Sequence, residues 1–145
     1  MSFDFRLATR DEILKLRHAV LRPGKPLETA YFDCDASEKT LHFGVFTQKG
    51  DAIVCATITP SFWEDKPSWQ LRGMATHPDY SRRGLGKALL ELIENELKEK
   101  SAANHLWCNA RESAFDFYQK SGWVFASEFF DIPGIGPHKK MIRIL

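Results

Sequence analysis

The chain has 145 residues, of which 20 are Lys or Arg and 19 are Asp or Glu, so its formal net charge is +1. A hydrophobic share of 43% and a charged share of 27% are typical of a folded globular protein. This length can bury a full core, so we expect one domain over residues 1–145, and the near-neutral charge gives no reason to expect a nucleic-acid or membrane surface as partner.

The first residues show the patterns of a strand and a capped helix. Residues 3–7 alternate between apolar and polar types, which predicts a half-buried strand. Thr9 precedes Glu12 by three residues, which is the spacing of a capping box. Apolar residues then recur with a helical period until residues 22–26, whose Pro and Gly end the helix.

A sheet region follows this helix. Residues 27–38 are irregular or form a short helix. Residues 41–47 and 52–59 are rich in β-branched and aromatic types, and the Gly-containing turn between them predicts a hairpin. We expect a loop over residues 61–68 and a further strand over residues 69–76.

The longest predicted element is an amphipathic helix that begins near the glycine pair of residues 84–86. Its apolar side is formed by Leu85, Ala88, Leu89, Leu92, Ile93 and Leu97. Residues 101–104 end the helix, and the short apolar run over residues 105–108 predicts a buried strand.

The last part of the chain predicts a second helix and two strands. Asn109 is the expected N-cap of a helix over residues 110–120, and Gly122 suits a left-handed cap after it. Residues 123–130 and 139–145 are the expected last strands, joined by a stiff turn rich in Pro and Gly. The order β-α-β-β-β-α-β-α-β-β predicts an α/β fold with a mixed sheet flanked by helices.

The spacing of the cysteines and the length of the apolar runs predict whether the protein has a metal site and where in the cell it resides. Cys34, Cys55 and Cys108 are far apart and lack metal-site spacing, so we expect reduced, mostly buried thiols and no metal site. No apolar run approaches the ~20 residues of a membrane span, and the N-terminus lacks the pattern of a signal peptide. We therefore expect a cytoplasmic protein.

The segment over residues 76–87 is the strongest functional pattern. A strand-like run leads through a short turn with Gly84 and Gly86 into the long helix. Glycine lets backbone N–H groups approach a ligand closely, and the first N–H groups of a helix lack intrahelical partners. With the helix dipole they form an anion site suited to phosphate, and Arg82 and Arg83 add full positive charge.

A solvated basic helix start is the alternative interpretation of this segment. It is the less favourable one, because cations beside the positive end of a helix dipole are repelled unless an anion offsets them. The spacing also excludes two well-known phosphate loops. The Walker A pattern is missing, and Leu89 stands where a dinucleotide fingerprint needs its third glycine.

Two segments carry a resemblance to a known family. Residues 71–78 (LRGMATHP), followed by residues 82–86 (RRGLG), are similar to an acetyl-CoA segment written [QR]-x-x-G-x-[GA] after a strand. Residues 114–123 (AFDFYQKSGW) are similar to A-x-x-F-Y-x-x-x-G-F, with Trp where Phe is usual. Together, and with the element order over nearly the whole chain, they resemble the GNAT superfamily of N-acetyltransferases. The tail over residues 129–138 more loosely resembles an ElaA-like subgroup.

The resemblance implies a GNAT-like fold and an N-acetyltransferase. Such an enzyme moves an acetyl group from acetyl-CoA, its co-substrate, to a primary amine by direct attack in a ternary complex. The implied cofactor-binding residues are Met74, Ala75, Thr76, Arg82, Arg83, Gly84, Leu85, Gly86, Lys87 and Asn109. Ser81 and Arg111 depart from the family pattern, which usually has Gln or Arg at the first position and Asn at the second.

The resemblance also implies that Tyr118 is the catalytic acid that protonates the departing thiolate. A phenol with a pKa of ~10 is protonated at neutral pH and can donate. The alternative is a tyrosine whose ring packs in the core. The general base is open, because residues 69–72 lack the Glu that members of the family often have there. Candidates besides a chain of water molecules are Glu28, Glu64, His77, Glu128 and His138.

Two other functions stand beside the enzyme. A non-catalytic acyl-CoA-binding or sensor domain on the same fold is compatible with the missing strand carboxylate, whereas Tyr118 favours the enzyme. A phosphate-binding module for nucleotide or RNA is disfavoured by the near-neutral charge. The identity of the amine acceptor is open, and a homodimer, which is common in the family, is not tested by the sequence.

Overall fold

The computed structural model describes residues 2–145, and the chain forms two compact units. Unit 1 comprises Met1–Thr59 and Leu71–Ile93, and unit 2 comprises Pro60–Gln70 and Glu94–Leu145. Three elements continue from one unit into the other along the chain: β3 (Ala52–Trp63), β4 (Lys66–Thr76) and α2 (Leu85–Lys100).

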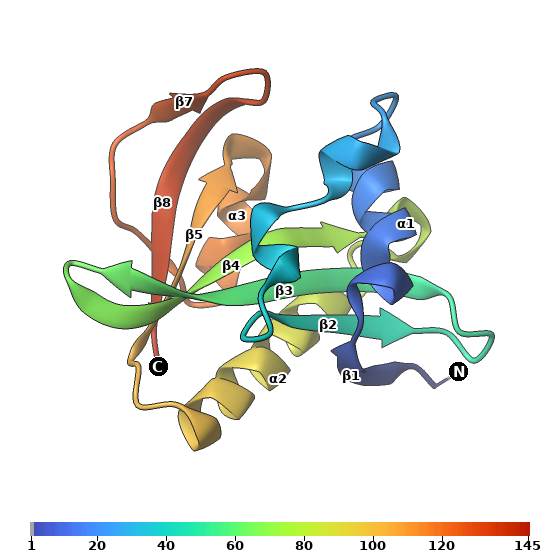
Figure 1. Cartoon of the computed structure of the whole chain (residues 1–145), viewed down its shortest axis with the longest axis horizontal. Helices are drawn as coiled ribbons and strands as arrows, with labels where there is room; N and C mark the ends of the chain where they lie inside the picture. The colour runs from blue at the N-terminus through green and yellow to red at the C-terminus, as the bar shows by residue number, and fades with distance from the viewer. Residues whose placement is uncertain (1) are drawn as a thin grey trace. The chain divides into compact units, whose positions relative to one another are not determined.

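Unit 1 contains an antiparallel sheet with a helix beside it (Figure 1). Its other elements are β1 (Asp4–Ala8), α1 (Arg10–Leu21), β2 (Leu41–Phe46) and the short 3-10 helices η1 (Leu27–Ala30), η2 (Asp33–Ala36) and η3 (Pro78–Tyr80). β2 lies between β1 and β3 and pairs with both. Ile13 and Leu16, three residues apart on one side of α1, pack in one cluster with Phe46, Cys55 and Ala75 of the strands.

The predicted capping box at the start of α1 is confirmed. The Glu12 N–H donates to Thr9 Oγ1 at 3.2 Å, and the Thr9 N–H donates to the Glu12 carboxylate at 2.9 Å. Arg6 donates to the same carboxylate at 2.8 Å. The hydrogen bonds from Arg6 and Thr9 lower the pKa of Glu12 to about 2. The helix ends at Leu21, as the following Pro and Gly predict.

A buried ion pair anchors the segment between α1 and β2. Arg17 of α1 is fully buried, and its Nη1 lies 2.7 Å from Asp35 Oδ2. The same guanidinium donates to the Ala30 carbonyl at 2.9 Å and to Thr57 Oγ1 at 2.7 Å. Burial acts to raise the pKa of Asp35, but the hydrogen bonds from Arg17 and from the Phe32 N–H outweigh it, so the pKa lies below its usual value.

Unit 2 is organised around its last strand. Its other elements are β5 (His105–Arg111), η4 (Glu112–Ala114), α3 (Phe115–Lys120), β6 (Val124–Phe125), β7 (Phe130–Ile132) and β8 (Gly136–Ile144). β8 runs antiparallel to β5 and also pairs with β6 and β7 (Figure 1, β8 in red and β5 in orange). β5 pairs in parallel with β4 at Trp69 and Gln70. Glu94, a charged residue of α2, is buried because Arg143 of β8 donates to it at 2.7 Å.

The helix predicted over residues 110–120 is shorter than expected. β5 continues to Arg111, whose backbone partner on β8 is His138, and α3 begins only after the η4 turn. Asn109 therefore lies inside a strand and is not a helix N-cap, so that prediction is wrong. Gly122 has the predicted left-handed conformation after the helix, with φ of 92°.

Two other expected elements also differ. The loop predicted over residues 61–68 is wrong, because β3 and β4 extend into it and meet at Glu64 and Asp65, whose φ values of 49° and 65° suit a two-residue hairpin turn. The single strand predicted over residues 123–130 is divided into β6 and β7, so the order contains one more strand. The α/β class, with a multi-stranded sheet flanked by helices, is confirmed.

The length and hydropathy of each helix show whether it could cross a membrane. Among residues 2–145, none has the length and apolar character needed to cross a bilayer.

We expect Asp35→Ala to destabilise the protein strongly. The substitution leaves the Arg17 guanidinium buried without its carboxylate, which costs about 3–5 kcal/mol for comparable pairs. Because the pKa of Asp35 is lowered in the folded state, the stabilisation by its carboxylate is present above its unfolded pKa and is lost as pH falls through the folded value. Urea unfolding at several pH values measures both effects. The control is Asp33→Ala, which removes an exposed carboxylate of the same short helix; an equal loss in both variants would contradict the prediction.

Candidate functional site

The turn before α2 presents unpaired backbone N–H groups. Arg82 and Gly84 both have a positive φ, 62° and 77°, a feature of turns whose N–H groups converge on an anion. The Gly84 carbonyl accepts the first bond of the helix, from the Ala88 N–H at 3.0 Å. The N–H groups of residues 85–87 therefore have no carbonyl partner within the helix. The backbone here has the form that the sequence predicts for an anion site.

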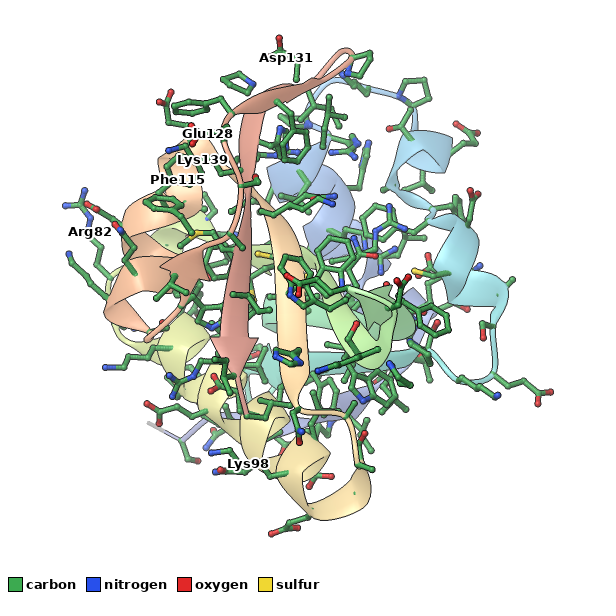
Figure 2. All side chains as sticks on the ribbon, turned by 90° about the vertical axis from the view of Figure 1, so that its left-hand side faces the viewer. Arg82, Lys98, Phe115, Glu128, Asp131 and Lys139 are labelled. Atoms are coloured by element: carbon green, nitrogen blue, oxygen red, sulfur yellow. The ribbon has the colours of Figure 1, made fainter. Side chains whose placement is uncertain are left out.

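Two cations stand beside this turn. Arg82 and Arg83 are exposed, and Figure 2 shows the Arg82 side chain extending away from the ribbon. The Arg83 guanidinium lies 5.1 Å from the centroid of the Tyr80 ring. That ring packs edge-on against Phe3 at 5.9 Å and His77 at 5.8 Å between centroids. Tyr80 thus fixes one of the two cations beside the positive end of the α2 dipole, where a bound anion stabilises them.

The end of β4 is irregular directly before the residues expected beside a thioester. Gly73 has a φ of 63°, which interrupts the extended backbone ahead of Met74. A Cβ at Gly73 would lie 2.7 Å from Phe32 Cε2, so both the conformation and the space favour glycine. Ala75 is buried, whereas Met74 and Thr76 are partly exposed. β4 then leads through η3 into the turn at residues 81–84.

Tyr118 of α3 is both a packed ring and a protonated hydroxyl. Its side chain is 5% exposed, and its ring lies 5.0 Å from that of Trp123. Its hydroxyl interacts with the Cys108 thiol. Burial, reinforced by Cys108, raises the pKa of Tyr118 well above its usual value, and burial raises the pKa of Cys108 to about 12. The hydroxyl therefore stays protonated across the physiological range.

Sequence reasoning missed Cys108 as the partner of Tyr118. The only signal for it is the alternation of β5, in which Leu106, Cys108 and Ala110 are buried and share one face. Which residue on that face meets Tyr118 depends on how α3 packs, and the sequence alone does not determine that.

Asn109 lies on the other face of β5. Its Oδ1 atom is buried and has no hydrogen-bond partner among residues 2–145. Buried acceptors are nearly always hydrogen-bonded in folded proteins, so an unpaired one is suited to an N–H donor from a ligand.

The five candidates for the general base differ in their surroundings. Three are exposed carboxylates: Glu28, Glu64 and Glu128. His77 caps η3, because its Nδ1 accepts the Asp79 N–H at 3.1 Å. His138 is 3% exposed, and its Nδ1 lies 2.7 Å from the Gly136 carbonyl oxygen.

The predicted site residues fall in both units. Unit 1 holds Met74, Ala75, Thr76, Arg82, Arg83, Gly84, Leu85, Gly86 and Lys87, and unit 2 holds Asn109 and Tyr118. In unit 1 they follow one another along β4, η3 and the start of α2.

The α/β fold and the family that matches this chain together indicate an acyltransferase. The acetyltransferase (GNAT) family matches residues 10–123, and the chain belongs to that family. This confirms the family that the motifs at residues 71–86 and 114–123 predict.

Known proteins agree with this assignment. The chain is 36% identical over 138 residues to the uncharacterized N-acetyltransferase YitI of Bacillus subtilis (strain 168), and the match covers 93% of this chain and 91% of YitI. Escherichia coli ElaA has the same fold, with a TM-score of 0.77 at 16% identity over 98% of this chain and 99% of ElaA. An aminoglycoside 6'-N-acetyltransferase complexed with coenzyme A superposes with a TM-score of 0.73 at 12% identity, over 97% of this chain and 96% of that one.

We expect one cysteine to react with iodoacetamide at pH 8 in the folded protein. Burial raises the pKa of Cys55 and of Cys108 to about 12, so both stay protonated and shielded, whereas Cys34 is partly exposed. Mass spectrometry should show one added group in the folded chain and three after unfolding in guanidinium. Rapid labelling of Cys108 in the folded state would contradict the burial of the pair that it forms with Tyr118.

Proposed function

We propose that this protein transfers the acetyl group of acetyl-CoA to a primary amine. The observation that carries the proposal is the turn at residues 82–87, where unpaired N–H groups, two left-handed residues and three basic side chains coincide at the start of α2. Family membership supports acyl transfer in general. The choice of acetyl-CoA, the amine acceptor and the residue roles are the proposal.

The turn at residues 82–87 would bind the diphosphate of coenzyme A. Its backbone N–H groups without helix partners can donate to phosphate oxygens, and the α2 dipole favours negative charge there. Arg82 and Arg83 are exposed and can close on the anion. The coenzyme A that accompanies the aminoglycoside acetyltransferase of the same fold supports this choice of ligand.

The end of β4 would position the thioester. The break at Gly73 changes the course of the backbone before Met74, so the Met74 N–H is the donor proposed for the acetyl carbonyl. Such a donor stabilises the oxyanion of the tetrahedral intermediate more than the carbonyl, and its removal costs about 3 kcal/mol in comparable enzymes. The remaining rate enhancement comes from alignment of the amine with the thioester.

Tyr118 would protonate the departing sulfur. Its pKa is raised, so the hydroxyl carries its proton until negative charge develops on the leaving thiolate. The proposed reaction belongs in the cytoplasm, because Cys34, Cys55 and Cys108 are free thiols.

We expect Gly84→Ala to weaken coenzyme A binding by at least about 10-fold, or about 1.4 kcal/mol. The new Cβ lies in the open space before α2 where the diphosphate would bind, and the residue loses its preferred left-handed conformation. Isothermal titration with acetyl-CoA and with CoA measures the loss. Gly50→Ala is the matched control, because Gly50 has a φ of 88° and equal open space in the β2–β3 turn. Wild-type protein that binds neither ligand would contradict the proposed function.

We expect Tyr118→Phe to lower kcat by about 10- to 100-fold while the dissociation constant for acetyl-CoA changes less than about threefold. The ring is kept and only the proton donor is lost. Release of coenzyme A thiol in the presence of a panel of amines measures the rate. Cys108→Ala removes the hydroxyl's partner and keeps the hydroxyl itself, so it should retain most activity. An unchanged kcat in Tyr118→Phe would remove the acid role from Tyr118, and binding without turnover in the wild type would favour a sensor.

A further inference from the structure

We propose that His138 is the general base that removes a proton from the attacking amine, with Asn109 as a second contact to that amine. This inference rests on the proposed function and adds the missing base to it, and it assigns Asn109 to the acceptor amine in place of the coenzyme contact that the family resemblance implies. It also rests on the geometry of the β5–β8 pair, which lies wholly within unit 2.

The structure fixes which ring nitrogen of His138 carries the proton. Nδ1 lies 2.7 Å from the Gly136 carbonyl oxygen, and a carbonyl oxygen can only accept, so Nδ1 must donate. In the neutral imidazole the lone pair is therefore on Nε2. Gly136 has a φ of 116°, so this carbonyl takes its direction from a backbone conformation that favours glycine. The ring is 3% exposed and lies beside Phe130, at 6.0 Å between centroids.

The strand register places Asn109 on the same face as His138. His138 pairs with Arg111 of β5, and paired residues of antiparallel strands direct their side chains to one side. Alternation along β5 puts Trp107, Asn109 and Arg111 on that side. The face therefore holds the Nε2 acceptor of His138 and the unpaired, buried Oδ1 of Asn109, together with two cationic side chains, those of Arg111 and Lys140. Two acceptors on one face of neighbouring strands suit a group with several N–H donors, which is what a primary amine has.

The proposed acid lies on the opposite face of the same strands. Tyr118 interacts with Cys108, and Ala110 pairs with Lys139, whose ammonium approaches the Phe115 ring of α3 (Figure 2). α3 and its tyrosine thus cover the even-numbered side of β5, and His138 belongs to the odd-numbered side. His138 and Tyr118 would therefore approach the reacting groups from opposite sides of β5.

The other histidines are engaged differently. The His18 ring is hydrogen-bonded to the Lys25 carbonyl. The His42 ring contacts Thr57 and Asp35. The His77 ring accepts the Asp79 N–H. His105 is at the far end of β5 from His138, opposite Ile144. His138 differs from these four in two ways. The hydrogen bond of its Nδ1 leaves the lone pair on Nε2, and the unpaired Oδ1 of Asn109 lies on β5 two residues from Arg111, the strand partner of His138.

The step balances as follows. An alkylammonium acceptor is protonated near neutral pH and cannot attack. It gives one proton to Nε2 of His138, and the neutral amine then forms a C–N bond to the thioester carbonyl carbon. The C–S bond breaks and the thiolate takes the proton of Tyr118. The proton on His138 and the second proton lost by the nitrogen of the tetrahedral intermediate pass to solvent, and the tyrosinate regains one proton from solvent. No oxidant or reductant is involved.

The first test is His138→Asn, because the Asn amide N–H can replace Nδ1 as donor to Gly136 while nothing replaces Nε2. We expect kcat for an alkylamine acceptor to fall by about 100-fold or more, within the range of general base catalysis, with the acetyl-CoA dissociation constant unchanged. With trifluoroethylamine, which is largely unprotonated at pH 7, the ratio of the wild-type kcat to the variant kcat should be at least tenfold smaller. His105→Asn is the control on the same face of the β5–β8 pair and should behave as wild type.

The second test leaves His138 intact. Gly136→Ala disturbs the carbonyl that orients the ring, whereas Gly134→Ala places the same residue at a neighbouring position of the same turn, with φ of 77° and equally open space. We expect kcat to fall in the first variant and to stay within about threefold of wild type in the second. This pair decides the question if His138→Asn fails to fold.

The outcomes separate the two proposals. A wild-type protein that acetylates no amine overturns the proposed function and the base with it. A wild-type protein that does so, while His138→Asn keeps its kcat or loses it equally with both amines, overturns the base assignment alone. Equal losses in the two glycine variants overturn it as well.

Discussion

The ladder between β5 and β8 is the interaction on which the chemistry of unit 2 depends. It runs without interruption from His105 opposite Ile144 to Arg111 opposite His138. Because side chains alternate along each strand, one register assigns every residue of β5 to a face. Cys108 meets Tyr118 on one face, and Asn109 joins His138 on the other. A shift by one residue would exchange these faces and place the tyrosine's partner on the wrong side.

Unit 1 depends in a similar way on a chain of close contacts between its residues. Gly73 is left-handed and closely covered by Phe32, and Phe32 packs under the Arg17 guanidinium at 4.0 Å. Arg17 is buried, and Asp35 together with the Ala30 carbonyl satisfies it. The irregular segment after α1 is thereby joined to the end of β4. The backbone at Met74 is thus defined by packing from a distant part of the chain, and not by β4 alone.

Local sequence patterns were sufficient to predict the two longer helices and the family. The Thr9–Glu12 pair and the apolar period of α1 and α2 act within a few residues, so they predict element and start together. The expected strand at residues 105–108 and helix at residues 110–120 failed at their common boundary. Pairing with β8 extends β5 to Arg111, and that partner strand lies far along the chain. The hairpin at Glu64 and Asp65 was missed because its residues are not the usual glycine or asparagine.

The sequence alone determined the class of chemistry. The glycines and arginines at residues 82–87 and the segment around Tyr118 are short, contiguous patterns whose chemical meaning does not depend on the rest of the chain. The tertiary structure decided the partners: Cys108 for Tyr118, and the Gly136 carbonyl and the Asn109 face for His138. These depend on which residues a β-ladder and a turn bring opposite one another. That is a property of long-range register, and no local pattern carries it.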